Sequence, residues 1–137
     1  MRHTSNALRI FFVISGLLTL FAGGFHALSG VYGDWFIGLT PSDVVDPSLD
    51  SQNRFYGAAF LLYGILFIFC SRELPRYADI MKIAFGTMFL AGCARGLTVA
   101  AYGWPTWQVC VLWFSEITLP PIAWLWLNHE LKKPTVL

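Results

Sequence analysis

ALRIFFVISGLLTLFAGGFHALS, residues 7–29, is an almost unbroken apolar stretch in which only Arg9 and His26 can carry a charge. An α-helix rises about 1.5 Å per residue, and about 20 apolar residues cross the hydrocarbon core of a bilayer. A helix on the surface of a soluble core would instead alternate apolar and polar faces. The stretch therefore predicts a membrane-spanning helix.

Three further apolar runs follow, at about 53–71, 79–102 and 107–128. Of the 137 residues, 56% are hydrophobic and 12% charged, whereas soluble proteins average roughly 25% charged residues. The links after the second and third runs are short, which makes neighbouring helices antiparallel. We expect an all-α protein, residues 1–137 forming one integral membrane domain, with four transmembrane helices in an antiparallel bundle.

Basic residues predict the orientation of this bundle. They gather at both termini and at the second link, and neither the connector 30–52 nor the third link has any: Arg2, Arg9, Arg72, Arg76, Lys82, Lys132 and Lys133. By the positive-inside rule, both termini are cytoplasmic and the connector faces outward, across a bacterial inner membrane. A cleaved signal peptide is the alternative, but the first run is longer than usual for one and no clean A-x-A site follows.

The connector 30–52 is predicted to be ordered rather than a loose tether. It carries interfacial side chains such as Trp35, and a short helix on the membrane surface is expected near residues 34–39. Asp50 or Ser51 is expected to cap the second span by accepting its free N–H groups. Two interpretations stay open: a lid over an outer cavity, or an interfacial loop without that role.

Polar side chains inside or at the ends of the runs are few: His26, Asn53, Arg54, Arg95 and Glu116. A charge at the centre of a membrane helix costs about 2.5–3.5 kcal/mol, so such groups usually face the bundle interior. Arg95 lies roughly 10 Å and Glu116 roughly 14 Å from the same end of adjacent helices. This predicts an ion pair that removes most of the burial penalty. The inner half of the runs has no comparable group, so we expect a polar pocket in the outer half.

The fourth run contains Pro120 and Pro121, which deprive the carbonyls of Glu116 and Ile117 of their helical partners. A kink just below Glu116 is expected, and it would either make room for a cavity or merely shape the bundle. Tyr56 and Tyr63 in the second run could line the pocket or form interhelical hydrogen bonds. Glycines in the first and third runs predict close helix packing: Gly16, Gly23, Gly30, Gly92 and Gly96.

Metal, cofactor and nucleic-acid sites are not predicted. Cys70, Cys93 and Cys110 lie in apolar runs without paired spacing, and they are expected to be small core residues. His26 has no second ligand at metal-binding spacing in its own helix. A net charge of +1 gives no sign of a nucleic-acid partner.

Asn53-Arg54-Phe55-Tyr56-Gly57 opens the second run, Arg95 lies late in the third, and Glu116 precedes Pro120 in the fourth. In these features the chain resembles an uncharacterised bacterial family of small four-helix membrane proteins, known as a domain of unknown function. The resemblance covers nearly the whole chain and implies a four-helix bundle, but no activity. The architecture is also similar to that of DoxX-like membrane proteins.

Three classes of function follow. In the first, the pocket binds a small amphipathic or lipid-like ligand, with Arg54 and Arg95 at its anionic or carbonyl head. The candidate binding residues are His26, Asn53, Arg54, Tyr56, Tyr63, Arg95 and Glu116. In the second, the chain is an accessory subunit that pairs with another membrane protein or a second copy. In the third, Glu116 is the general acid or base of a membrane enzyme, with His26 as second proton-transfer group. Transport is less favoured because four spans are few and no inverted repeat is visible.

Overall fold

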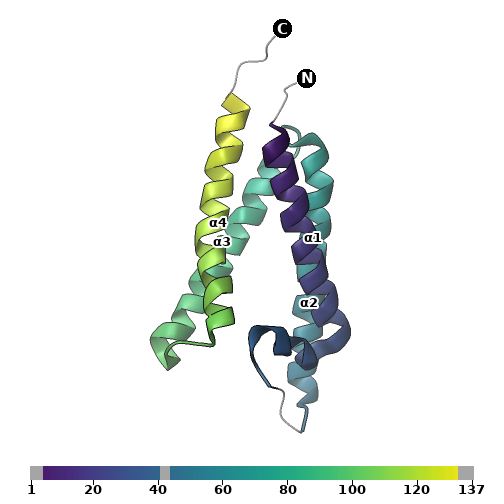
Figure 1. Ribbon diagram of the computed structural model, residues 1–137, viewed down its shortest axis with the longest axis vertical. Coiled ribbons are helices and arrows are strands. Elements are labelled where there is room, and N and C mark those ends of the chain that lie inside the picture. Colours follow the sequence, from purple (N-terminus) through teal and green to yellow (C-terminus); the bar gives the residue numbers. More distant parts are fainter. Residues whose placement is uncertain (1–4, 41–43, 133–137) are drawn as a thin grey trace.

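The computed structural model describes residues 5–40 and 44–132, and within them all regular structure is helical. Four long α-helices are joined by two short 3₁₀ helices and one extended link (Figure 1). Their bounds are α1 Asn6–Ser29, η1 Gly30–Ile37, α2 Pro47–Cys70, η2 Ser71–Glu73, α3 Ala78–Tyr102 and α4 Trp107–Lys132. The predicted all-α fold with four helices is confirmed.

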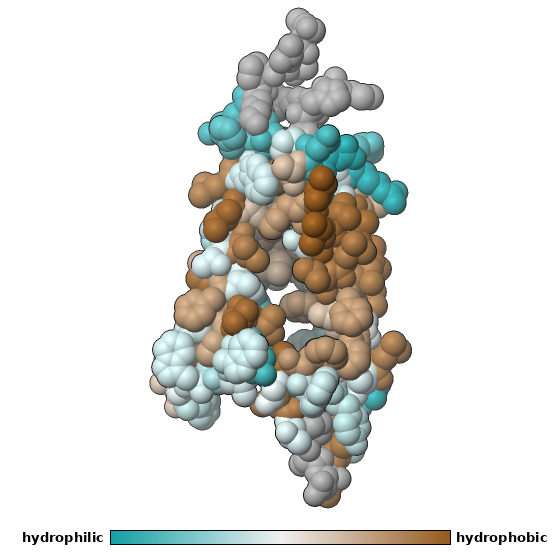
Figure 2. Space-filling model, in the orientation of Figure 1, coloured by the Kyte–Doolittle hydropathy of each residue, from teal (hydrophilic) through white to brown (hydrophobic). Residues whose placement is uncertain are grey.

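All four long helices are long and apolar enough to cross a membrane, which fits a multi-pass membrane protein. Figure 2 shows a broad hydrophobic band over their outward surfaces, with hydrophilic residues near the start of α1 and the end of α4. Large apolar side chains such as Leu18 and Leu125 are exposed along the band. Soluble proteins rarely expose continuous apolar surfaces of this kind, whereas lipid covers them at no cost.

The second helix begins at Pro47, and the expected start near Asn53 and cap at Asp50 or Ser51 are wrong. Asp46 is the N-cap, and its carboxylate accepts the N–H of Ser48 at 2.8 Å. Pro47 favours a first helical position because its fixed φ suits the helix and its missing N–H needs no partner. The short helix expected at residues 34–39 is present but lies earlier, as η1.

Helices α1 and α2 pack through a seam of glycines. Gly16 on α1 faces Gly64 on α2, and Gly23 on α1 faces Gly57 on α2. In each pair the carbonyl oxygen of the α2 glycine approaches the α1 glycine. A Cβ built on Gly23 would lie 2.7 Å from the Gly57 carbonyl oxygen. The expectation of close packing at Gly16 and Gly23 is confirmed, and Gly57 and Gly64 supply the other side of the seam.

Helices α3 and α4 form a second antiparallel hairpin around another glycine. Gly92 is buried, and a Cβ placed on it would lie 3.1 Å from the Cβ of Glu116. The indole N–H of Trp113 donates to the Gly92 carbonyl at 2.8 Å. The Trp113 ring also covers Gly96. Both glycines therefore allow α4 to approach α3 where Glu116 lies.

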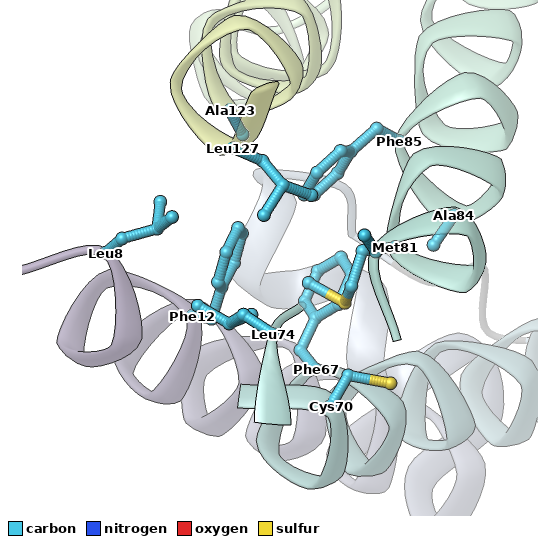
Figure 3. Packing of buried hydrophobic residues seen from close by; sticks show 11 residues of the cluster. Leu8, Phe12, Phe67, Cys70, Leu74, Met81, Ala84, Phe85, Ala123 and Leu127 are labelled. Atoms are coloured by element: carbon cyan, nitrogen blue, oxygen red, sulfur yellow. The ribbon is translucent and has the colours of Figure 1, made fainter. Parts of the chain in front are cut away.

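The buried core that the two hairpins share lies at the end where α1 begins and α4 ends, called here the closed end. Phe12 of α1 stacks on Phe85 of α3 with ring centroids 5.5 Å apart, and Phe67 lies 5.9 Å from Phe85. Figure 3 shows these rings together with aliphatic side chains of α1, α3 and α4, with Cys70 of α2 and with Leu74, which follows η2. The buried set is Leu8, Phe12, Phe67, Cys70, Leu74, Ala78, Met81, Ala84, Phe85, Ala123 and Leu127. Toward the opposite end, called the open end, the hairpins diverge (Figure 1).

Polar contacts reinforce the closed end. The buried carboxylate of Glu130 accepts the backbone N–H of Ser5 at 3.0 Å, which ties the end of α4 to the start of α1. Arg9 donates through Nε to the Ser71 carbonyl at 3.1 Å, which ties α1 to η2. A buried acid here was not expected, because Glu130 lies beyond the predicted apolar run and α4 continues to Lys132.

Candidate functional site

Arg95 and Glu116 form the predicted ion pair across the second hairpin. Arg95 Nε donates to Glu116 Oε2 at 2.7 Å, a charge-assisted hydrogen bond between α3 and α4. The two partners differ in exposure: the Glu116 side chain is 8% exposed and the Arg95 side chain is 40% exposed. The carboxylate of the pair is therefore buried, whereas the guanidinium is accessible.

A small cavity of about 80 Å³ lies against Glu116, where all four helices meet. Its wall is formed by Thr19 of α1, Phe60 and Tyr63 of α2, Thr87, Met88 and Ala91 of α3, and Glu116 of α4. Met88, Ala91 and Arg95 follow one another at helical spacing, so they share one face of α3. The cavity thus lies between the shared core and the ion pair, at the place where the hairpins begin to separate. A hollow between the hairpins can be followed in Figure 2.

The hydroxyl groups of both threonines in this wall donate hydrogen bonds to backbone carbonyls. Thr19 donates to the Ser15 carbonyl at 2.8 Å, and Thr87 donates to the Ile83 carbonyl at 2.9 Å. Each bond stays within its own helix, a common arrangement for threonine in membrane helices. Apart from Tyr63 and Glu116, the wall is therefore chemically close to hydrocarbon.

A second opening lies on the membrane-facing side of the same hairpin, beside the prolines of α4. This groove of about 330 Å³ is lined by Phe85, Gly86, Phe89, Pro120, Pro121, Trp124 and Leu125. Helix α4 runs without interruption through Pro120 and Pro121. The expected kink below Glu116 stays a prediction, and this groove does not include Glu116.

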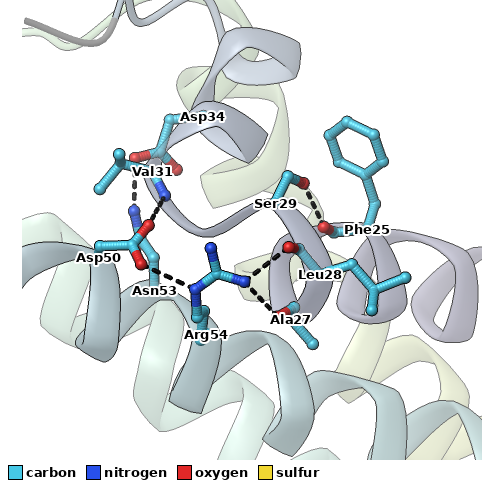
Figure 4. Close-up of polar contacts among 9 residues, drawn as sticks. All are labelled: Phe25, Ala27, Leu28, Ser29, Val31, Asp34, Asp50, Asn53 and Arg54. Carbon is cyan, nitrogen blue, oxygen red and sulfur yellow. Dashed lines mark hydrogen bonds and ion pairs between the residues drawn. The ribbon is translucent and has the colours of Figure 1, made fainter. Parts of the chain in front are cut away.

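The remaining predicted polar residues lie in a separate cluster at the open end of the first hairpin. We call it the connector cluster: His26, Asp34, Asp50, Asn53 and Arg54. Figure 4 shows its members other than His26. Asn53 donates to Asp34 Oδ2 at 2.7 Å, and His26 Nε2 lies 3.5 Å from Asp34 Oδ1. Arg54 donates through Nε to Asp50 Oδ2 at 2.7 Å.

This cluster terminates α1 and positions η1. Arg54 Nη1 donates to the carbonyls of Ala27 at 3.3 Å and Leu28 at 2.6 Å, which are among the last carbonyls of α1. Asp50 Oδ1 accepts the N–H of Val31 at 3.0 Å. Arg54 and Asp50 therefore satisfy backbone groups on both sides of Gly30, where the chain turns.

Gly30 is required at that turn for two reasons. Its φ is 59°, a conformation that favours glycine. A Cβ on it would also lie 2.6 Å from Cγ of Asp50. We expect Gly30→Ala to detach Asp50 from the Val31 N–H and to increase hydrogen exchange across residues 30–37.

The matched control is Gly24→Ala, one turn and a half earlier in α1. The new Cβ there would meet only Cδ1 of Leu61, at an ordinary 3.6 Å. Amide exchange measured by mass spectrometry should separate the two variants. Equal protection of residues 30–37 in both would show that Gly30 does not hold the turn.

The segment η1 also reaches the second hairpin. The Thr106 hydroxyl donates to the Ile37 carbonyl at 2.7 Å, and the Gln108 side chain lies against Gly38. Phe36 packs edge-on against Phe25 with centroids 4.7 Å apart. The connector therefore joins the two hairpins across the open end, on the far side of the ion pair from the shared core.

The structure thus divides the predicted site residues into two groups. Glu116 and Tyr63 line the cavity, and Arg95 lies beside it as the ion-pair partner of Glu116. His26, Asn53 and Arg54 belong to the connector cluster. Among the described residues, no hydrogen bond or ion pair joins the groups. Tyr56 lines neither and is 60% exposed on α2. In residues 5–40 and 44–132, no three His, Cys, Asp or Glu side chains are arranged to hold a metal ion.

Sequence reasoning missed Asp34 and Asp50 as members of the connector cluster. One signal was available: Asp50 and Arg54 are four residues apart, the spacing of an ion pair along one helix face. The contact of Asp34 had no such signal, because it depends on how η1 folds back toward α2. The same holds for Thr106, whose acceptor lies in η1.

Comparison with known proteins adds a family but no activity. No curated protein and no solved structure matches the chain. The similarity in architecture to DoxX-like proteins therefore stays a hypothesis. The model of the family described as domain of unknown function DUF4345 matches residues 7–127, which is nearly the whole chain, and the chain therefore belongs to the DUF4345 family.

Proposed function

We propose that this protein binds a small lipid-like amphiphile between its two hairpins, with the polar head of the ligand at Arg95 and part of its apolar body toward the cavity. One observation carries the proposal: the Arg95 side chain is 40% exposed although it lies within an apolar helix, and only its Nε donates to another described residue. A guanidinium has five N–H donors. Donors at membrane depth need acceptors.

The surroundings support the same function. The closed end supplies a rigid base, and the connector spans the open end between α1 and α4. Entry from the side, between the diverging hairpins, is then the natural route for a lipid-like molecule. The positive charges of the closed end favour a bacterial inner membrane with the connector outward, as expected from the sequence. The connector then acts as the lid of the binding space.

The alternatives receive less support from the geometry. An accessory subunit would use the ion pair only to fix helix register, and a sealed pair would suit that role better than one with an exposed Arg95. A membrane enzyme would need a second proton-transfer group beside Glu116. The proposed second group, His26, faces Asp34 and packs against Gly33 of η1 instead.

The test removes both charges of the pair together. In Arg95→Gln/Glu116→Gln the amide nitrogen at position 95 takes the place of Nε, and Glu116→Gln keeps the shape of its side chain. The two amides can therefore still bond to each other, and the fold is expected to persist. The matched control is Arg76→Gln/Glu73→Gln, which removes an exposed pair with a 3.3 Å contact at the closed end. Native mass spectrometry of each protein, released from membranes in mild detergent, would record bound lipid-like species.

We expect the wild type and the control to carry the same bound species, and the cavity variant to lose most of it. A loss of about tenfold in affinity corresponds to about 1.4 kcal/mol, roughly one hydrogen bond to a charged donor. Equal occupancy in all three proteins would contradict the proposal. Occupancy lost equally from both double variants would show an unspecific effect of charge and would contradict it too.

A further inference from the structure

The charge balance around Arg95 restricts the chemistry of the ligand head. Glu116 neutralises Arg95 within the pair, and no other residue of the cavity wall is charged: Thr19, Phe60, Tyr63, Thr87, Met88 and Ala91. A carboxylate or phosphate placed beside Arg95 would add a third charge, next to the buried Glu116. In a low-dielectric site an uncompensated charge is strongly disfavoured. The positive charge of Arg95 is therefore already balanced by Glu116, and the site does not need an anionic ligand.

The remaining N–H groups of Arg95 need a hydrogen-bond acceptor that carries no charge. Arg95 keeps its terminal N–H groups free of described partners, since only Nε is used for Glu116. A carbonyl oxygen has two lone pairs and no proton, so it can accept from these donors without changing the net charge. Tyr63 also lines the cavity, but the wall that it helps to form is apolar. Arg95 is therefore the donor available to such a ligand.

The cavity restricts the rest of the molecule. Because Thr19 and Thr87 are bonded to their own helices, the wall beyond Tyr63 and Glu116 offers only carbon surfaces. A hydroxylated or charged body would find no partners there. The volume of about 80 Å³ admits the end of an alkyl chain or a small ring edge, not a whole lipid. The remainder of the ligand must lie between the hairpins or in the bilayer.

We infer that the ligand is a neutral carbonyl amphiphile, a fatty-acyl ester or a ketone, rather than a fatty acid anion. This inference rests on the proposed function and specifies the head group that the same site recognises. Arg95 donates to the carbonyl oxygen, and Glu116 keeps the site neutral while it holds Arg95 in place. No covalent step is involved.

The test compares two probes that differ only at the head: spin-labelled stearic acid, at a pH where it is ionised, and its methyl ester. The protein is reconstituted in bilayers of zwitterionic lipid. Electron paramagnetic resonance gives the fraction of each probe that is immobilised. We expect the wild type to bind the ester about tenfold more tightly than the acid, and Glu116→Gln to reverse this order because Arg95 is then an unpaired cation. Glu73→Gln, in the exposed pair of the closed end, should keep the wild-type order.

Each outcome bears on a different statement. Acid bound as tightly as the ester by the wild type would overturn the neutral-head inference and leave ligand binding intact. Neither probe immobilised beyond the level of lipid contact would overturn the proposed function together with the inference. An ester preference that Glu116→Gln leaves unchanged would show that charge balance does not set it, and would also overturn the inference. The wild-type comparison decides by itself if Glu116→Gln does not survive purification.

Discussion

Gly57→Ala is expected to be among the most destabilising single substitutions in this protein, although it adds only one methyl group. The new Cβ would lie 2.7 Å from the carbonyl carbon of His26 and closer still to the backbone nitrogen of Ala27. Both are backbone atoms within α1, so no side chain can rotate away. The helices must separate along the seam or shift in register. Overpacking usually costs about 1–3 kcal/mol, and we expect about 3 kcal/mol here.

The consequence extends beyond the first hairpin. Arg54 reaches the last carbonyls of α1 only because α1 and α2 lie so close at this level. Separating the helices at Gly57 would therefore also weaken the end of α1 and the turn at Gly30. Gly57→Leu is expected to prevent formation of the hairpin altogether, with loss of the monodisperse peak in size-exclusion chromatography.

The matched control is Gly86→Ala in the interior of α3. A Cβ at Gly86 meets no atom within 4 Å. Alanine also favours a helix over glycine by about 1 kcal/mol, so stability should be unchanged or slightly raised. Titration of micelle-embedded protein with sodium dodecyl sulfate, followed by circular dichroism, gives the free energies of unfolding. A Gly57→Ala protein as stable as Gly86→Ala would contradict the rigid seam.

The spans were predictable because apolar length alone decides which segments can cross a bilayer. The bounds of α2 were not, because residues 47–52 are polar and are helical through the Asp46 cap and Pro47 rather than through hydropathy. Glu130 was missed for a related reason. It follows the apolar run of α4, yet the helix continues past it and buries its carboxylate at the start of α1. Hydropathy predicts which residues lie within the membrane, but it does not predict where a helix begins or ends.

The ion pair was predictable because the short link between α3 and α4 fixes the relative depths of Arg95 and Glu116. Depth does not give lateral position, however. His26 and Arg54 lie in the same half of the bundle as the pair, but their partners come from the connector and from the end of α1. A sequence read one helix at a time could not show that the two hairpins diverge. That divergence places the groups in separate clusters.

Removing one member of the Arg95–Glu116 pair should cost more than removing both. Arg95→Gln leaves the carboxylate of Glu116, 8% exposed, without its cationic partner. Breaking a fully buried pair costs about 3–5 kcal/mol. Because the Arg95 side chain is 40% exposed, the pair is only partly buried, and we expect about 2 kcal/mol.

The two single variants should not be equivalent. In Glu116→Gln the unpaired charge is on Arg95, whose long side chain can extend toward the membrane surface, so about 1 kcal/mol is expected. In the double variant no charge is left, and the two amides can bond to each other. Its stability should stay close to that of the wild type, so the coupling between the positions should approach about 3 kcal/mol, the sum of the two single losses.

The same sodium dodecyl sulfate titration measures all three variants, with Arg76→Gln, Glu73→Gln and their double as the exposed pair for comparison. That pair should show a coupling near zero, since it lies at the surface of the closed end. Additive losses at Arg95 and Glu116 would mean that neither charge depends on the other. The carboxylate would then be stable without the guanidinium, and Arg95 would have no structural reason to lie beside it.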